Sequence, residues 1–378
     1  MSAAPGWRQA PLASLVRDGE ISYGIVQPGY HVDAGIPIVR VGDIRSGVIS
    51  VVAPLRVEPS VAARYARTSL RGGEVLVSLV GTVGESAVVP DQLAGWNVAR
   101  AVAVLRPEGV SAAWIRLCLQ TSAVRHQVSG LLNTTVQATL NLADLKRLSL
   151  PVAPDREMVA IAEVLGVLDD KIAANAKLAN TADELAAVKF KMLGSSDAAP
   201  GQLGDILVLE YGKALPSSLR LPGQVDVYGS SGVVGSHNVA LCCGRGVVVG
   251  RKGTVGAVHW ASGPHFPIDT TFYVTPRTDR CTDIFCYFVL KSLRLAEMNS
   301  DSAVPGLNRS EAHAIPISIP GKVAIERFSE RAYRLFEAKT QTEQESRTLA
   351  AVRDALLPQL MSGRLRVKDA EALVEDAV

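Results

Sequence analysis

Two adjacent cations, Arg251 and Lys252, stand directly before a Gly-Thr-Val-Gly stretch that begins at Gly253. Glycine-rich turns let backbone N–H groups come close to phosphate oxygens, and neighbouring cations strengthen that attraction. An earlier Gly-Thr-Val-Gly stretch is preceded instead by the apolar residues Leu79 and Val80. The asymmetry predicts that this turn is a structural corner in both places and contacts phosphate only in the second.

Patterns that carry bond-making chemistry are missing from the rest of the sequence. Residues 244–254, GRGVVVGRKGT, approach a phosphate-binding loop, but the glycine spacing is wrong and Thr254 is displaced. The chain has no Asn-Pro-Pro-aromatic motif of an amino-methyltransferase, no Gly-x-Ser-x-Gly and no Gly-x-Gly-x-x-Gly. Its five cysteines form no Cys-x-x-Cys pair, and no His-Glu-x-x-His motif occurs. We therefore predict no catalytic residue and no metal site in this chain.

The composition is that of an ordinary globular protein, with 48% hydrophobic residues. A chain of 378 residues is longer than one hydrophobic core usually serves, so more than one domain is expected. We see no signal peptide, and charges interrupt the long apolar runs, so no membrane segment is predicted. Free thiols suit a reducing compartment, which predicts a cytoplasmic protein. The net charge of +2 does not by itself indicate a nucleic-acid partner.

The sequence contains an internal repeat. Residues 75–89 (VLVSLVGTVGESAVV) and residues 247–261 (VVVGRKGTVGAVHWA) are identical at six of fifteen positions. Asn97 and Asp269 stand at matching places after these segments, each before an apolar run with strand character. The order of strand, glycine turn and strand therefore occurs twice.

The repeat continues beyond these strands. Leu140-Asn141 is matched by Leu307-Asn308, and an apolar, proline-containing strand follows each pair. We predict that the two leucines pack in the core and that the two asparagines cap a helix or bond to the backbone.

A long helical pattern follows each copy. The first begins near Asp155, with Asp155 as a plausible N-cap, and carries apolar residues every seven positions from Leu165 to Leu193. About 39 residues at ~1.5 Å each make a rod of about 58 Å. The second begins after Gly321 and repeats every seven positions from Phe328 to Leu356, until Pro358 interrupts it.

The two apolar stripes predict an antiparallel coiled coil within the chain. The alternative is two separate surface helices, each packed on its own domain. Asn175 interrupts the first stripe, and it either is buried and fixes the register or faces solvent.

The predicted fold class is α+β, with two similar domains separated by two long helices and related by a pseudo-two-fold axis. The predicted segments are 1–150, 151–195, 196–320 and 321–378. Such a chain would bind one elongated partner molecule at two separate places.

In the order of its motifs, the chain resembles the specificity (S) subunit of type I restriction–modification enzymes over nearly its whole length. Each motif is weak alone, but their doubled order around two long helices is highly specific. The motifs are EISYGIVQPG (20–29), GIPIVRVGDI (35–44), GTVGESAVVP (81–90), LNLADLKRLSLPVAP (140–154), VYGSSGVVGSHN (227–238), VVGRKGTVGAV (248–258), SAVPGLNRSEAHAIPISIP (302–320) and LLPQLMSGRLRV (356–367).

The resemblance implies that 1–150 and 196–320 are target-recognition domains, and that 151–195 and 321–378 hold the conserved helices. It implies a non-catalytic subunit that binds a bipartite double-stranded DNA target with a fixed gap. It also implies two methyltransferase subunits and two restriction (motor-nuclease) subunits as partners. S-adenosylmethionine, ATP and Mg²⁺ would then belong to those partners, and this chain would bind no cofactor. The alternative is a two-domain scaffold protein with no role on nucleic acid.

Base readout requires short polar and basic side chains on elements that enter the major groove. The stretches around Tyr23, Lys213 and Ser230 are either fold-forming turns or DNA contacts. A polar loop just ahead of Leu140 is better placed for contact. The candidate DNA-binding residues are Tyr23, Arg40, Arg45, Arg100, Thr134, Thr135 and Gln137 in the first domain, and Lys213, Ser230, Ser231, Arg251 and Lys252 in the second.

Overall fold

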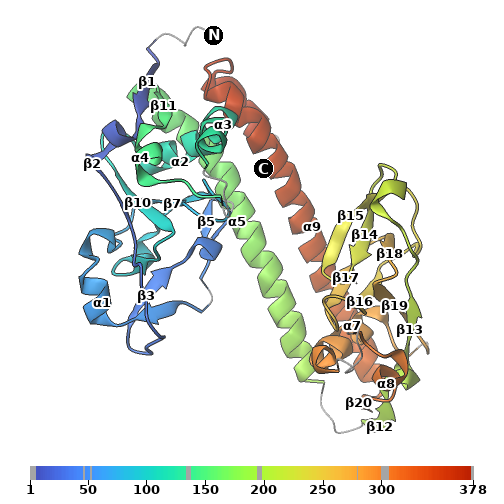
Figure 1. Cartoon of the computed structure of the whole chain (residues 1–378). Coiled ribbons are helices and arrows are strands. Elements are labelled where there is room, and N and C mark those ends of the chain that lie inside the picture. Colours follow the sequence, from blue (N-terminus) through green and yellow to red (C-terminus); the bar gives the residue numbers. More distant parts are fainter. Residues whose placement is uncertain are drawn as a thin grey trace. The chain divides into compact units, whose positions relative to one another are not determined.

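The structure is a computed structural model that describes residues 6–45, 47–51, 53–132, 138–193, 198–278, 280–298 and 306–375. The chain combines helices and sheets and divides into two compact units (Figure 1). Unit 1 consists of Met1–Ala174 and Glu345–Val378, and unit 2 consists of Asn175–Gln344. Each unit therefore contains one globular part and a portion of each long helix.

The two long helices are α5 (Asp155–Lys191) and α9 (Lys322–Leu360), of 37 and 39 residues. At ~1.5 Å per residue they measure about 56 and 58 Å, close to the prediction. Helix α5 begins at Asp155, but the first N–H groups bond to the carbonyl of Pro154, so the N-cap is one residue earlier than predicted. Pro358 does not end α9, which continues to Leu360. A proline so near the helix end removes one backbone hydrogen bond and leaves little helix to disrupt.

The globular part of unit 1 is built on a four-stranded sheet in the order β2-β10-β7-β8. A three-stranded sheet, β6-β3-β9, and a two-stranded sheet, β1-β11, accompany it. Helix α2 (Ala112–Gln120) packs against the four-stranded sheet, and its Trp114 is fully buried. The strands are β1 (Arg8–Pro11), β2 (Val16–Tyr23), β3 (Ile36–Val39), β6 (Leu55–Val57), β7 (Val75–Ser78), β8 (Ser86–Val88), β9 (Asn97–Val98), β10 (Val102–Pro107) and β11 (Ser149–Val152).

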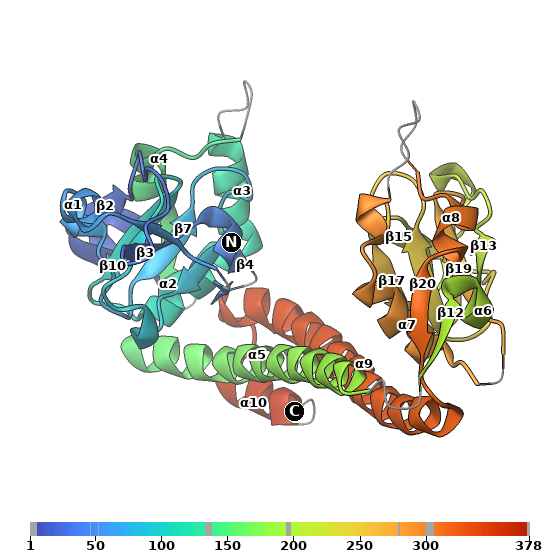
Figure 2. The same cartoon turned by 90° about the horizontal axis from the view of Figure 1, so that it is seen from below.

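Unit 2 repeats the topology of these three sheets, whereas a further two-stranded sheet of unit 1, β4-β5 (Ile44–Arg45 and Val48–Ile49), has no counterpart among the described residues of unit 2. The sheets of unit 2 have the orders β13-β19-β16-β17, β15-β14-β18 and β12-β20, and several of these strands are labelled in Figure 2. Helix α7 (Asp283–Ser292) takes the place of α2. The strands are β12 (Ala199–Gln202), β13 (Leu207–Tyr211), β14 (Val225–Gly229), β15 (Gly232–His237), β16 (Gly246–Gly250), β17 (Val258–Ala261), β18 (His265–Pro267), β19 (Thr271–Pro276) and β20 (Pro316–Ile319). The predicted doubling of the chain is confirmed.

The two Gly-Thr-Val-Gly turns are the same structure. In each, the valine N–H donates to the first glycine's carbonyl, at 2.9 Å for Val83 and 3.0 Å for Val255. All four glycines have a positive φ between 75° and 88°, which favours glycine because a Cβ is strained there. The prediction of a structural corner in both copies is confirmed.

The Leu-Asn pairs also behave as predicted. Leu140 and Leu307 are 1% and 4% exposed, and each donates its N–H to the strand end before the glycine turn. Asn141 caps α4 (Leu142–Arg147), and Asn308 caps α8 (Arg309–His313), each through its side-chain oxygen.

The match of Asn97 with Asp269 is wrong. Hydrogen bonds into the strands of the two units show that Ala99 corresponds to Ile268, which makes Arg100 the counterpart of Asp269. The segment between the glycine turn and this point is three residues longer in unit 1, so a constant sequence offset fails there. Asn97 is instead buried, and its amide bonds with Thr68 and Tyr65.

Both long helices pack together inside each unit. In unit 1, Leu165 of α5 shares a core with Leu349 and Leu356 of α9. In unit 2, Ala186 of α5 shares a core with Phe328 of α9. Of the seven-residue stripes, Leu165, Ala179, Ala186, Phe328, Leu349 and Leu356 are buried, whereas Ile172, Leu193, Leu335 and Thr342 are half-buried.

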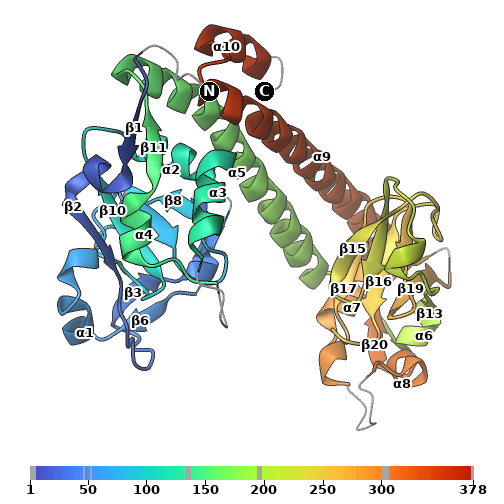
Figure 3. The same ribbon diagram turned by 45° about the horizontal axis from the view of Figure 1, so that its top comes forward.

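Charged and polar groups accompany the stripes. Asp169 pairs with Arg353 at 2.9 Å in unit 1, and Asp183 pairs with Lys339 at 2.6 Å in unit 2. Asn175 is 6% exposed, so of its two predicted positions the buried one is observed. Beyond α9, helix α10 (Val367–Glu375) packs back onto the core of unit 1 through Ala370 (Figure 3).

The glycine corner in unit 2 yields a test. A Cβ on Gly256 would lie 2.5 Å from the backbone N of Ala296, whereas a Cβ on Gly253 would meet only the Ser230 hydroxyl at 3.1 Å. Both substitutions carry the strain of a positive φ, about 1–2 kcal/mol, but only Gly256→Ala forces backbone apart, which adds about 1–3 kcal/mol. We expect Gly256→Ala to lower the free energy of unfolding by about 2–5 kcal/mol. Denaturant titration of both variants checks this, and equal losses would contradict it.

Candidate nucleic-acid interface

In unit 2, one end of the four-stranded sheet gathers several basic residues. Strand β16 ends at Gly250, and the N–H groups of the next two residues, Arg251 and Lys252, both donate to the carbonyl of Thr270 at 2.9 and 3.1 Å. The carbonyl of Arg251 in turn accepts from the N–H of Leu307 at 2.9 Å. Backbone bonds therefore fix the end of β16, the start of β19 and the approach to α8 beside one another.

Tyr211, the last residue of β13, lies at the same end of the sheet. Its side chain is 50% exposed and has two guanidinium groups near its ring, with the Cζ atoms of Arg251 and Arg309 at 5.2 and 5.1 Å from the ring centre. These distances fit cation–π attraction. Arg251 is held further because its Nη2 donates to the carbonyl of Asp269 at 2.7 Å.

Three more predicted residues belong to segments that adjoin this end. The N–H of Lys213 donates to the carbonyl of Pro267 at 3.1 Å. Ser230 and Ser231 form the two-residue connection of the β14–β15 hairpin. The hairpin touches the glycine turn, since a Cβ on Gly253 would lie 3.1 Å from the Ser230 hydroxyl.

The structure thus brings together all five candidates that the sequence placed in the second domain. Sequence reasoning missed the contribution of Tyr211 and Arg309. Their neighbours in the chain give no signal of the stacking, because it arises only when β13, β16 and α8 pack at one sheet end.

In unit 1, Tyr23 occupies the position that Tyr211 has in unit 2, since Tyr23 pairs with Ala103 of β10 as Tyr211 pairs with Phe272 of β19. The glycine after each tyrosine is required by packing. A Cβ on Gly24 would lie 1.9 Å from a carbonyl oxygen, and a Cβ on the glycine after Tyr211 would lie 2.1 Å from one. Both tyrosine-glycine pairs are therefore strand ends that the fold itself needs.

Arg40 and Arg100 lie close to Tyr23. The residues before them, Val39 and Ala99, are joined by a hydrogen bond of 2.9 Å, and the N–H of Arg100 donates to the carbonyl of Ile25. Arg40 also holds its own turn, because its N–H and guanidinium donate to the carboxylate of Asp43 at 2.8 and 3.4 Å. Part of its charge is therefore already paired.

Arg45 is placed differently. It ends β4 (Ile44–Arg45), which pairs with β5 (Val48–Ile49), and its Nε donates to the carbonyl of Gly42 at 3.2 Å. The β4–β5 hairpin approaches α2, since a Cβ on Gly47 would lie 2.7 Å from the guanidinium of Arg116. The candidates Thr134, Thr135 and Gln137 lie outside the described residues.

The two units differ in the length of the segment that connects one pair of matching strands. Strands β14 and β15 are joined by two residues, whereas the matching strands β3 and β6 are joined by residues 40–54. The predicted residues Arg40, Arg45, Ser230 and Ser231 all fall in these matching connections. The same place in the fold therefore presents different side chains in the two units.

Buried titratable groups in unit 2 are structural. His265 is 1% exposed, and its Nδ1 lies 2.9 Å from the carbonyl of Gly263 and 3.1 Å from that of Gly244. Burial lowers the pKa of His265, so the ring is neutral at neutral pH and donates from Nδ1. Burial raises the pKa of Cys242 to about 11, which leaves its thiol protonated and unreactive. Among the described residues, no three metal-ligating side chains cluster.

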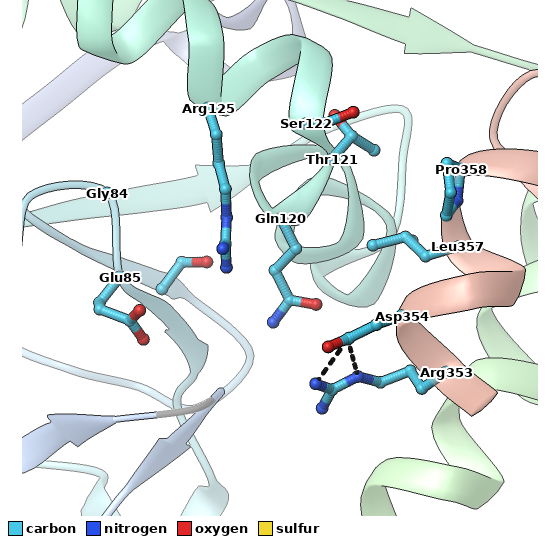
Figure 4. Close-up of a pocket in the computed structure, with 11 residues that line it drawn as sticks. Gly84, Glu85, Gln120, Thr121, Ser122, Arg125, Arg353, Asp354, Leu357 and Pro358 are labelled. Carbon is cyan, nitrogen blue, oxygen red and sulfur yellow. Dashed lines mark hydrogen bonds and ion pairs between the residues drawn. The ribbon is translucent and has the colours of Figure 1, made fainter. Parts of the chain in front are cut away.

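A polar cavity of about 330 Å³ lies in unit 1 between the turn after β7, the start of α3 (Ser122–Leu131) and the end of α9 (Figure 4). Arg353 in its wall donates twice to Asp354, at 2.8 and 3.0 Å, and once to Asp169. Hydroxyl groups line the cavity, but none of the lining residues is a histidine or a cysteine.

No model of a known protein family matches the chain. A stretch of 172 residues is 27% identical to the specificity subunit of the type I restriction enzyme EcoBI from Escherichia coli. The match covers 44% of this chain and 36% of that protein, so it spans about a third of the curated relative's length.

One solved structure has a similar fold over a greater length. The type I restriction–modification S subunit from M. genitalium superposes with a TM-score of 0.62 at 17% identity, covering 94% of this chain and 96% of that one. The S-type subunit from Thermoanaerobacter tengcongensis gives a TM-score of 0.40 at 15% identity, with 97% and 99% covered. The resemblance to the specificity subunits of type I restriction–modification enzymes is thereby confirmed.

In the described part of the chain, no helix has the length and apolar character needed to span a bilayer.

Proposed function

We propose that this chain is the DNA-recognition subunit of a type I restriction–modification assembly. Each unit reads one half of a bipartite double-stranded DNA target and so directs adenine methylation and restriction by partner subunits. The chain itself performs no bond chemistry. The observation that carries the proposal is the doubled sheet register, because two copies of one recognition fold suit a target with two halves.

The helices supply the geometry for this function. Ion pairs and apolar contacts join α5 to α9 in both units, as described above. In unit 1 the N-terminal part of α5 packs against the C-terminal part of α9. In unit 2 the C-terminal part of α5 packs against the N-terminal part of α9. We infer one continuous antiparallel coiled coil that relates the two recognition domains by a pseudo-two-fold axis. Half-sites read from one side of B-DNA are centred about 34–36 Å apart, a distance within the reach of helices of about 56–58 Å.

The partners in this proposal are two methyltransferase subunits and two restriction subunits, which would supply S-adenosylmethionine, ATP and Mg²⁺. An apolar stripe on the outer face of α5 in unit 2 suits such a partner. It consists of Leu178, Leu185 and Val188, with Met192 just beyond the end of α5, and these side chains are 53%, 41%, 51% and 76% exposed. Their spacings of seven, three and four residues place them on one helical face, where a partner helix can bury them.

The stripe can be tested by adding charge. Leu178→Asp with Leu185→Asp should leave folding unchanged, because both side chains are exposed, but should reduce copurification with the methyltransferase subunits at least tenfold. Leu219→Asp is the matched control, since Leu219 is 64% exposed in the same unit but lies away from α5. Equal copurification of the double variant and the control would remove this surface from the proposal.

Domain exchange tests the function itself. Residues 1–150 are replaced by the corresponding part of another type I specificity subunit, and methylated adenines are mapped in cells that also express the partner subunits. We expect one half of the methylated motif to change and the other half to stay, because each domain is a complete copy. A change in both halves would contradict the division of the target between domains. The absence of any sequence-specific methylation with the unaltered chain would favour the scaffold alternative.

A further inference from the structure

The matching sheet ends of the two units have opposite chemistry. Hydrogen bonds and strand pairs show which residue of unit 1 matches which residue of unit 2 at this end of the sheet, and Tyr23 matches Tyr211. Unit 2 has four cations where unit 1 has apolar side chains. The pairs are Lys213 with Ile25, Arg251 with Leu79, Lys252 with Val80, and Arg309 with Leu142.

Asp269 of unit 2 is also reversed in charge, since its counterpart is Arg100. At these five matched positions, unit 2 has four positive charges and one negative charge, and unit 1 has one positive charge.

The two arginines of unit 2 are held in place before any ligand arrives. The guanidinium Cζ atoms of Arg251 and Arg309 lie over the Tyr211 ring, at 5.2 and 5.1 Å from its centre. Backbone bonds fix Lys252 beside the glycine turn, where its side chain is exposed. The Lys213 side chain is exposed as well. Fixed cations lose little side-chain freedom when they bind, so such a cluster suits a repeated anion.

Unit 1 cannot make the same contacts. Ile25 and Leu79 are 1% and 6% exposed and belong to the hydrophobic core. Val80 and Leu142 pack against that core. The backbone is the same, but its side chains point inward to stabilise the domain and carry no charge.

We propose that the two domains share the affinity for DNA unequally. The second domain binds the phosphodiester backbone through Lys213, Lys252, Arg251 and Arg309, and the first domain relies on few ionic contacts. This inference rests on the proposed function and adds an asymmetry to it. It follows that most of the salt dependence of binding arises in unit 2, because each phosphate contact releases counterions.

The test is the salt dependence of DNA binding by the assembled complex with its methyltransferase subunits. The duplex carries both half-sites, identified beforehand from the methylation motif. The variant Lys213→Gln, Lys252→Gln, Arg309→Gln leaves Arg251, which bonds to the backbone, in place. If each side chain neutralises one phosphate, the slope of log K against log salt becomes shallower by about 2.7. The matched control, Arg100→Gln in unit 1, should change the slope by at most about 0.9.

A transplant gives the reverse test. Val80→Lys with Leu142→Arg places unit 2 cations on unit 1 and should steepen the slope by up to about 1.8. Thermal unfolding of each variant verifies that the fold is retained. If the triple variant binds its motif with an unchanged slope, the asymmetry is wrong and the proposed function stands. If the unaltered complex does not bind DNA specifically, both are wrong.

Discussion

The burial of an apolar stripe of α5 against one of α9 is the interaction on which the rest of the chain depends. In each unit the largest hydrophobic core includes residues of both helices. In unit 1, Trp114 and Leu117 of α2 share one core with Leu165 and Leu356 of the helices. Each globular part is therefore anchored to the portions of α5 and α9 in its own unit.

The two units add different contacts to the apolar packing and ion pairs that join their helices. In unit 1, Asp169 accepts from the guanidinium groups of both Arg116 and Arg353, so one carboxylate links α2, α5 and α9. Arg116 is only 8% exposed, and loss of Asp169 would leave its charge buried without a partner, which is costly.

In unit 2, aromatic packing takes this role. Phe190 of α5 lies 5.6 Å from both Phe288 of α7 and Phe328 of α9 between ring centres. Tyr333 of α9 donates to Asp283 of α7, and burial together with this bond raises the pKa of Tyr333 to about 12. Both junctions combine an apolar core with an ion pair, but the carboxylate network on Asp169 is specific to unit 1 and the aromatic cluster around Phe190 to unit 2.

Sequence patterns predicted the parts whose structure is local. The Gly-Thr-Val-Gly corners need a positive φ, and the asparagines that cap α4 and α8 act within three residues, so both could be seen without a structure. The match of Asn97 with Asp269 failed because a length difference in the connecting segment shifts the register, and sequence spacing does not reveal it. The stacking of Arg251 and Arg309 on Tyr211 is equally hidden, since its members meet only through tertiary packing. Arg40 was predicted as a DNA contact from its type, but its bond with Asp43 depends on the turn it adopts.

The central claim is that the helix pair sets the distance between two DNA-reading domains. Its most direct test inserts four helix-forming residues between Ala174 and Asn175 and four more between Gln344 and Glu345, the points where the two units meet along the chain. Each insertion adds about 6 Å and roughly one turn, so the stripes on both helices stay aligned. Methylated adenines are then mapped in cells that express the variant with its partner subunits. The account predicts that both half-sites persist while the gap between them grows by one or two base pairs, at ~3.4 Å each. An unchanged gap with full methylation would contradict it.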